Sequence, residues 1–158
     1  MIPEELQGLA AAAQERKRPC RVCVCTAASC AAAGGSKLLG EVKREVKEAA
    51  LGERVEVRSV GCMGLCSAGP LVTVTQESGE TQLYREVAPE DARAVVASVG
   101  GEPFAAKQQA TDIPFFTRQR KIVLENSGSI DPERLEDYVA VDGYAALHRA
   151  LTEMTAAE

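Results

Sequence analysis

The sequence has no tryptophan, few other aromatic residues and a single histidine, His148. Proteins that bind single-stranded nucleic acid stack the bases on aromatic side chains, so this shortage argues against that class. The formal net charge of −5, with acidic and basic residues interspersed, also gives no concentrated positive face. We therefore expect no nucleic-acid partner. With one distant histidine, no Ser–His–Asp or Cys–His catalytic arrangement can be argued.

Long apolar runs are missing as well. No stretch approaches the ~20 apolar residues of a membrane-spanning helix. Residues 1–19 carry the alanine-rich pattern of an amphipathic helix rather than a secretory signal. We therefore expect no transmembrane segment and a cytoplasmic location, with any membrane attachment made through partners. In that compartment thiols stay reduced, and clustered cysteines indicate metal binding or catalysis more often than disulfides.

Cysteine, in contrast, is present in a distinctive pattern. Four of the six cysteines fall in two close pairs, Cys25-Thr-Ala-Ala-Ser-Cys30 and Cys62-Met-Gly-Leu-Cys66. Thiolates brought together on a compact scaffold can hold a metal ion or an iron–sulfur cluster. A [2Fe-2S] cluster takes two thiolates for each iron, and two local pairs provide one pair per iron if they meet.

The hydrophobic pattern predicts an alternation of strands and helices. The expected elements are a strand at Arg21–Cys25, a helix that Ser36 caps and Gly52 ends, strands at Arg54–Val60, Leu71–Thr75 and Thr81–Tyr84, and a helix from Pro89 to Gly100. This order suits an α/β layer fold of the thioredoxin-like kind. It places both cysteine pairs in loops that follow strands, and loops at neighbouring strand ends can converge.

The cysteine spacing resembles that of the thioredoxin-like [2Fe-2S] ferredoxins. That family pairs Cys-x4-Cys or a longer spacing with a later Cys-x3-Cys, which Ser-Ala-Gly-Pro follows here. The resemblance covers roughly residues 18–100 and implies an α/β, thioredoxin-like [2Fe-2S] ferredoxin fold with a C-terminal extension. It further implies that a [2Fe-2S] cluster is the cofactor, and that the metal ligands are Cys25, Cys30, Cys62 and Cys66.

The C-terminal part of the sequence resembles a second family. Ile113–Leu124, Gly128–Glu133 and the Gly143-Tyr144 motif look like the opening of the NADH-binding flavoprotein (diaphorase) subunit of respiratory complex I and its relatives. In NAD-linked hydrogenases and formate dehydrogenases, this subunit can carry a thioredoxin-like ferredoxin domain in front. The expected organisation is an N-terminal helix at 1–19, a ferredoxin domain at 20–101, a linker at 102–114 and an incomplete flavoprotein segment at 115–158.

The two resemblances together imply an electron-transfer module of an NAD(H)-linked oxidoreductase complex, of the hydrogenase, formate dehydrogenase or NADH dehydrogenase type. Such a module passes single electrons to or from a flavin or a neighbouring cluster and is not catalytic alone. Its partners are the flavoprotein and other iron–sulfur subunits. The sequence ends at Glu158, before any glycine-rich flavin and NADH loop. FMN and NAD are therefore expected only on a partner or a missing region.

Finer expectations apply to the segment after residue 120. Lys121–Glu125 has the composition of a strand, Asp131 is a candidate helix cap, and a last helix at Gly143–Met154 is expected to bury Leu147 and Leu151. The nearby acidic residues are interpreted as capping or solvated groups: Asp131, Glu133, Glu136 and Asp137. The two basic clusters are interpreted as solvated faces or as a docking site for an acidic protein: Arg16–Arg18 and Arg118–Lys121.

Other interpretations of the cysteines stay open. The paired thiols can form a structural zinc site or be inert, which would make the chain a cluster-free or zinc-binding assembly module of the same complex. Cys20 and Cys23 are expected to be bystanders, although Cys23 shares a strand face with Cys25 and could replace a ligand. Cys20-x2-Cys23 could also be a redox pair, as in a thiol–disulfide enzyme.

Overall fold

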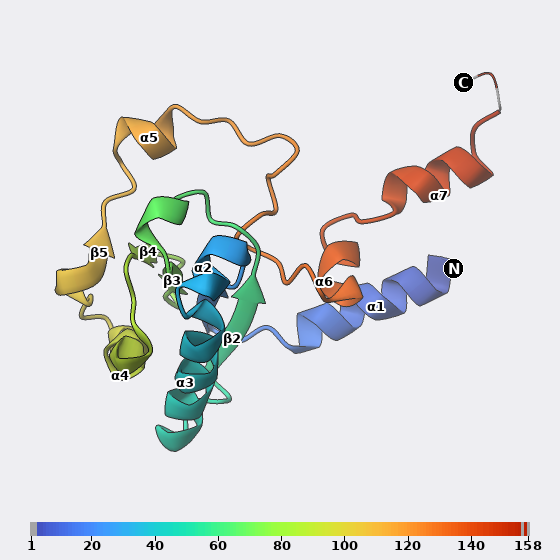
Figure 1. Cartoon of the computed structure of the whole chain (residues 1–158). Helices are drawn as coiled ribbons and strands as arrows, with labels where there is room; N and C mark the ends of the chain where they lie inside the picture. The colour runs from blue at the N-terminus through green and yellow to red at the C-terminus, as the bar shows by residue number, and fades with distance from the viewer. Residues whose placement is uncertain (1–2, 156, 158) are drawn as a thin grey trace. The chain divides into compact units, whose positions relative to one another are not determined.

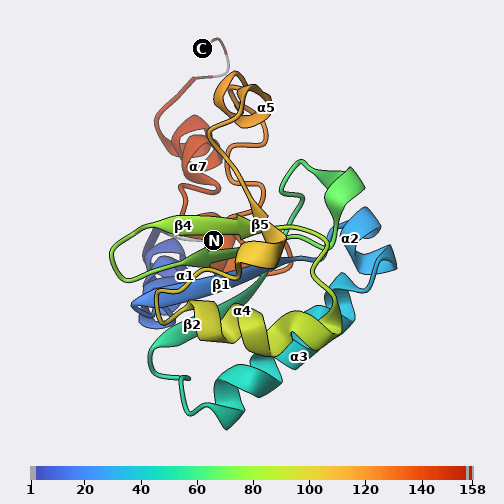
Figure 2. The ribbon, with the colours of Figure 1, turned by 90° about the vertical axis from the view of Figure 1, so that its left-hand side faces the viewer.

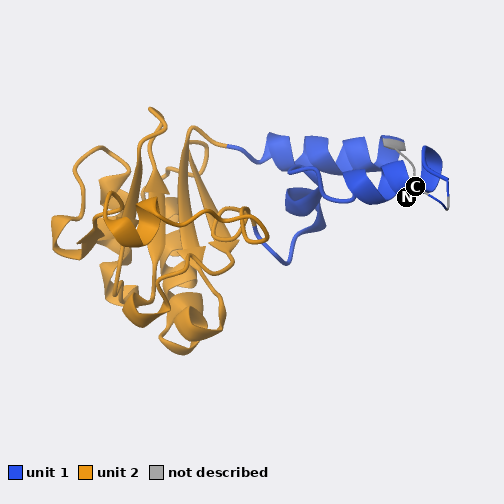
Figure 3. Ribbon diagram, turned by 90° about the horizontal axis from the view of Figure 1, so that it is seen from above, with its two compact units in different colours: residues 1–17, 131–158 blue, residues 18–130 orange. Residues whose placement is uncertain are grey.

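The computed structural model describes residues 3–155 and 157. Contacts within the chain define two compact units, which Figure 3 colours separately. Residues 18–130 form one unit, and residues 1–17 form the other together with residues 131–158. The boundary at residue 130 falls within the 115–158 segment that resembles a flavoprotein. Each unit is described below by itself.

The unit of residues 18–130 is built on a five-stranded mixed sheet of order β2-β1-β3-β4-β5. The central strand β1 (Cys20–Cys25) runs parallel to β2 (Val55–Val60) and antiparallel to β3 (Val72–Thr75). The hairpin partner β4 (Thr81–Tyr84) and the short β5 (Gln108–Gln109) complete the sheet. Figure 1 shows the ribbon coloured along the chain, with β2, β3, β4 and β5 labelled. The predicted α/β class and the four longer strands are confirmed.

The helices of this unit are short apart from α3. They are α2 (Ala28–Ala32), α3 (Gly35–Glu48), α4 (Ala92–Ser98) and α5 (Pro114–Thr117), with 3-10 turns η1 (Cys66–Ala68), η2 (Pro89–Asp91) and η3 (Ala105–Lys107). Figure 2 shows α3 and α4 together on one face of the sheet. Between the two helices and that face lies the main core, which contains Val22, Val24, Leu38, Val42, Val72, Val74, Tyr84, Val95 and Val96.

The alternation of side chains along β1 separates its cysteines. Cys20 packs in the main core beneath the helices, whereas Cys23 and Cys25 point to the opposite face. That opposite face has its own smaller apolar cluster, which includes Val60 and Leu71. The predicted alternation of side chains is thus confirmed. It places Val22 and Val24 in the main core and Cys23 and Cys25 in the smaller cluster.

Helix α3 begins two residues earlier than predicted. Gly34, with φ +101°, is the N-cap in place of Ser36, and no side chain caps the helix. Gly35 explains the shift, because a methyl group there would lie 2.6 Å from the Cys25 carbonyl oxygen and 2.8 Å from that of Cys30. The first turn of α3 is therefore packed tightly against the backbone of the first cysteine pair, and only glycine fits that approach.

Helix α3 also ends at Glu48, four residues before the predicted stop at Gly52. Ala50 adopts a left-handed conformation with φ +54°, and the N–H of Leu51 donates to the carbonyl of Val46 at 2.9 Å. This is the backbone arrangement that commonly ends helices, and here it forms without glycine. Within α3, Arg44 forms an ion pair with Glu48 at 2.9 Å.

Several predictions for the segment after residue 120 are wrong. Residues 122–130 form bends and turns, so Lys121–Glu125 is no strand. Val123 is 93% exposed, and strand propensity without a neighbouring strand does not hold an extended backbone. Asp131 caps no helix; its carboxylate accepts the N–H of Glu133 at 3.0 Å in a local turn.

The second unit contains α1 (Pro3–Glu15), α6 (Leu135–Val139) and α7 (Ala145–Thr152). Helix α1 packs on α6, and Arg16 forms an ion pair with the buried Asp137. Asp137 is therefore a structural partner of the N-terminal helix rather than a solvated carboxylate. Leu147 and Leu151, predicted to be buried, are 53% and 76% exposed. Across the described part of the chain, no helix has the length and apolar content to cross a bilayer.

Candidate metal centre

The first cysteine pair is built into the scaffold. Cys25 is the last residue of β1 and Cys30 lies in the short helix α2, which the sequence did not predict. Both residues are almost wholly buried, at 0% and 1% exposed. The N–H of Cys25 donates to the Leu71 carbonyl at 3.0 Å, and that of Thr26 donates to the Val60 carbonyl at 3.0 Å. Neighbouring strands on both sides therefore fix this pair.

The second pair lies in the loop between β2 and β3. Cys62 follows β2 and is half-buried, whereas Cys66 begins η1 and is exposed. The two sulfur atoms are 3.4 Å apart. The N–H of Gly64, a residue with φ +96°, donates to the Cys62 sulfur at 3.3 Å. A left-handed glycine thus turns the loop so that a backbone donor reaches a thiol sulfur.

The two pairs meet at Gly69. A methyl group at this position would lie 2.9 Å from the Cys30 sulfur and 3.5 Å from the Cys66 carbonyl oxygen. The absence of a side chain therefore lets the second loop close directly over the first pair. Electrostatic effects also link the two segments, because hydrogen bonding to Ser29 lowers the pKa of the Cys66 thiol and hydrogen bonding to the Leu71 backbone lowers the pKa of Cys30.

Backbone hydrogen bonds to the chain after β4 hold the end of the second loop. The N–H of Glu86 donates to the Ala68 carbonyl at 2.8 Å, and that of Val87 donates to the Pro70 carbonyl at 3.1 Å. The Gly69–Pro70 peptide bond between these two anchors is cis. The segment that follows β4 therefore holds Ala68 and Pro70, at the end of the loop.

The thiols perturb one another electrostatically. Burial, together with the neighbouring Cys25 and Cys66 thiols, raises the pKa of Cys30 to about 11. A hydrogen bond with Cys62 raises the pKa of Cys66, and charge on Cys62 and Cys25 acts in the same direction. The repulsion crosses between the pairs, so all four predicted sulfur atoms share one site.

The four thiols are of the donor type that both candidate metal centres use. A [2Fe-2S] cluster takes two thiolates for each iron, and a structural zinc ion takes four donors around one point. Within the described residues, no three or more His, Cys, Asp or Glu side chains are placed to hold a metal ion.

The remaining cysteines lie apart from this donor set. Cys20 is buried on the helix-covered face of the sheet, and Cys23 lies on the opposite face, so the two cannot approach as a redox pair. Burial raises the pKa of Cys23, whose thiol hydrogen bonds to Thr73. Cys23 does share its apolar cluster with Cys25, as its strand position predicts.

Ser127 was not identified from the sequence, and the particular contacts of Ser29 and Gly69 were not predicted. The Ser127 hydroxyl donates to the carbonyl of Cys62 at 2.7 Å. Ser29 lies inside the Cys-x4-Cys motif and Gly69 in the Ser-Ala-Gly-Pro sequence, so both carried a local signal. Nothing in the spacing of the cysteines pointed to Ser127, which is separated from Cys62 by 65 positions. His148 lies in α7 of the other unit.

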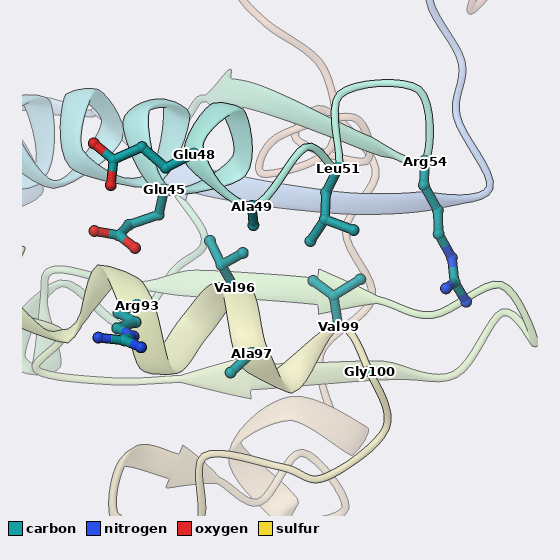
Figure 4. A pocket seen from close by; sticks show the side chains of 10 residues that line it. All are labelled: Glu45, Glu48, Ala49, Leu51, Arg54, Arg93, Val96, Ala97, Val99 and Gly100. Atoms are coloured by element: carbon teal, nitrogen blue, oxygen red, sulfur yellow. The ribbon is translucent and has the colours of Figure 1, made fainter.

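The unit also has an open groove of about 540 Å³ at the C-terminal end of α3 (Figure 4). Leu51, Val96 and Val99 line its apolar part, and charged groups including Glu45 and Arg93 stand at its edge. This end of α3 is about 20 Å along the helix from the first turn, which contacts the cysteines. No cysteine or histidine lines the groove, so it is separate from the thiol site.

Comparison with known proteins identifies the class to which this fold and thiol arrangement belong. A sequence model of the family described as thioredoxin-like [2Fe-2S] ferredoxin matches residues 12–100, more than half of the chain. The chain belongs to the thioredoxin-like [2Fe-2S] ferredoxin family. The fold expectation is therefore confirmed, and the family indicates an iron–sulfur protein that transfers electrons.

Solved structures of a ferredoxin from Aquifex aeolicus agree. The wild-type thioredoxin-like [2Fe-2S] ferredoxin is 25% identical with a TM-score of 0.52, and the match covers 60% of this chain and 99% of that one. A second structure of a thioredoxin-like [2Fe-2S] ferredoxin from the same organism is 24% identical, with a TM-score of 0.53 over 62% and 96% of the two chains. A cysteine-to-serine variant matches at 24% identity, a TM-score of 0.51 and coverage of 58% and 98%.

Proposed function

We propose that this chain is an electron-transfer module in which Cys25, Cys30, Cys62 and Cys66 hold a [2Fe-2S] cluster. The convergence of these four thiols on the fold of the family carries the proposal. Each pair supplies the ligands of one iron: Cys25 with Cys30 from the scaffold, and Cys62 with Cys66 from the loop. When bound, such a cluster supplies one-electron oxidation and reduction.

The protein contributes position, insulation and hydrogen bonds. The sheet and α2 keep water from the first pair, whereas Cys66 meets solvent and gives a route for electrons to a partner. The Gly64 N–H, the Leu71 N–H and the Ser29 hydroxyl donate toward the sulfur atoms. Hydrogen bonds of this kind stabilise added negative charge and raise the reduction potential.

The chain is further proposed to serve an NAD(H)-linked complex of the hydrogenase, formate dehydrogenase or NADH dehydrogenase type. The sequence likeness of Ile113–Leu124 and Gly128–Glu133 to the opening of the NADH-binding flavoprotein supports this assignment. The flavin and the nicotinamide site are assigned to a partner or to sequence beyond this chain. In this arrangement the electron carried by the ferredoxin unit is exchanged with a flavin or a neighbouring cluster.

Anaerobic reconstitution with iron and sulfide, followed by a spectroelectrochemical titration, tests the proposed cofactor. We expect visible absorbance that bleaches with one electron per chain, at a low potential on the order of −400 mV as in plant-type ferredoxins. A chain that takes up zinc but no acid-labile sulfide would instead support a zinc-binding assembly module.

Purification of the tagged chain from its own cells tests the proposed complex. We expect a flavin-containing subunit in stoichiometric amount and NADH-dependent reduction of the ferredoxin absorbance in the purified assembly. An assembly without flavin, or one that reduces the ferredoxin only with a donor other than NADH, would refute the NAD(H)-linked assignment and leave the electron-transfer proposal intact.

A further inference from the structure

We infer that the turn at residues 126–129, here called the clasp, positions the loop that carries Cys62 and Cys66, and that Ser127 is its positioning residue. The inference rests on the proposed function for its consequence at the cluster. The clasp lies outside residues 12–100, the part of the chain that matches the ferredoxin family, and is separated from that region by β5 and α5.

The first contact is a hydrogen bond at the start of the second pair. The Ser127 hydroxyl donates to the carbonyl oxygen of Cys62 at 2.7 Å in a partly buried setting. It fixes the peptide unit between Cys62 and Met63, at the end of the loop opposite Ala68 and Pro70. The Gly64 N–H, which donates to the Cys62 sulfur, lies two residues further on.

The second contact is close packing of the backbone. Gly128 has φ +87°, and a methyl group there would lie 3.2 Å from Cγ and 3.4 Å from Cα of Met63. Met63 is 8% exposed and belongs to the apolar cluster that surrounds the first cysteine pair. The clasp therefore packs against Met63, which belongs to that cluster. Glycine suits position 128 because it tolerates the left-handed backbone and leaves room for Met63.

The third contact ties the clasp to the sheet. The Arg58 guanidinium donates to the Ser129 carbonyl at 3.2 Å, and the same group forms an ion pair with Glu56 at 2.5 Å. Arg58 belongs to β2 and is 9% exposed, so its side chain has little freedom. The Ser129 hydroxyl closes the turn by donating to the Asn126 carbonyl at 2.7 Å.

Phe116 adds a fourth contact from the same stretch of chain. It packs, partly buried, against the apolar cluster of Cys25, Cys30 and Met63. The segment between β5 and residue 130 thus touches the thiol site at two places, on the face of the sheet opposite α3 and α4. Because the second compact unit begins at residue 131, the clasp also joins the Cys62 loop to the chain that leads into that unit.

The variant Ser127→Ala removes the hydroxyl and tests the clasp, with Ser36→Ala, an exposed position on α3, as the matched control. One hydrogen bond changes the equilibrium constant for local opening by about a factor of 3 to 10. We therefore expect iron release to a chelator to accelerate about 3- to 10-fold in Ser127→Ala. We also expect a shifted EPR signal of the reduced protein. Ser127→Thr keeps the hydroxyl and is expected to restore both properties, which a general loss of stability would not do.

A second measurement uses the cluster-free, reduced protein. Alkylation of Cys62, followed by peptide mapping, is expected to be about 3- to 10-fold faster in Ser127→Ala than in the wild type, with no change in Ser36→Ala. Gly128→Ala is expected to act in the same direction, because its methyl group would displace Met63. This readout reports on the loop whether or not a cluster assembles.

The outcomes separate the two proposals. A wild type that assembles no [2Fe-2S] cluster refutes the proposed function, while the alkylation rates still decide whether the clasp holds the loop. A wild type with a cluster, combined with wild-type rates of iron release and Cys62 alkylation in Ser127→Ala and Gly128→Ala, overturns the clasp and leaves the proposed function standing.

Discussion

The two cysteine pairs occupy opposite kinds of environment within one site. Cys25 and Cys30 are almost wholly buried, at the end of the central strand and in a short helix. Cys62 and Cys66 lie in a loop where the second thiol is exposed. The first pair is fixed by the same hydrogen bonds and packing that hold the sheet together, whereas the second needs dedicated contacts from Gly69, Ser29 and Ser127.

In the proposed cluster, this difference would give the pairs separate tasks. The buried pair would hold its iron in a fixed place and keep water from it, and a low local dielectric would strengthen the effect of each nearby donor. The second pair, through the exposed Cys66, would bring the other iron within reach of a partner. The iron between Cys62 and Cys66 is therefore the expected point of electron exchange, and we expect partner docking on that side of the unit.

The largest effect is expected from removing a thiol of either pair. Cys30→Ala and Cys66→Ala each leave one iron without a ligand, so we expect little or no [2Fe-2S] absorbance after reconstitution, measured against Cys20→Ala as the control. Added small thiols are expected to restore absorbance to Cys66→Ala, because the position is open to solvent, and not to Cys30→Ala. Equal rescue of both variants would show that the pairs do not differ in access.

The rate of alkylation in the cluster-free, reduced protein should separate the pairs next. We expect Cys25 and Cys30 to react roughly 100-fold more slowly than Cys66, because reagents reach them only when the structure opens locally. The thiolate is the reactive form, and the pKa of Cys66 is raised above the ordinary thiol value of 9.0, so its rate should still be rising with pH at about pH 9. Peptide mapping from about pH 7 to 10 gives both quantities; a rate at Cys66 that levels off below about pH 9 would contradict the raised pKa.

Gly69→Ala tests the point where the pairs meet. The added methyl group would crowd the Cys30 sulfur, and overpacking of this kind costs about 1–3 kcal/mol. We expect a lower midpoint in chemical unfolding of the cluster-free protein and iron release about tenfold faster or more. Gly40→Ala is the matched control, since Gly40 lies in α3 with open space around it. Identical behaviour of the two variants would mean that the loops do not close over each other at Gly69.

The smallest effect is expected from Ser29→Ala, which deletes one hydrogen bond between the pairs. The Ser29 hydroxyl stabilises negative charge at the Cys66 sulfur, so its loss should lower the reduction potential. A change of about 1 kcal/mol corresponds to a shift of about 40 mV for a one-electron couple. Spectroelectrochemistry measures this shift, and an upward shift would contradict the assigned hydrogen bond.

The sequence predicted the elements that local patterns govern. The alternation of valine and cysteine in β1 predicted that Cys25 faces away from the helices, and the structure shows this separation. The thiols of the two predicted pairs come together because β1 and β2 are parallel neighbours whose ends lie at the same edge of the sheet. Their role as cluster ligands remains a proposal.

Features that depend on distant contacts could not be predicted. Helix α2 has only five residues and no side-chain cap, so its stability comes from the packing of Cys30 rather than from a periodic pattern. The start of α3 is set by the close approach of Gly35 to two carbonyl groups. Lys121–Glu125 has strand composition but no strand beside it. The hydrogen bond between Ser127 and Cys62 joins residues that no local pattern connects.

The central claim is that the buried and exposed pairs together hold one [2Fe-2S] cluster. Analysis of iron and acid-labile sulfide in the purified chain, isolated without oxygen, tests it most directly. We predict two irons and two sulfides per chain, as the cluster requires. A protein that contains zinc without sulfide, or no metal under conditions in which the wild-type fold is intact, would contradict the claim.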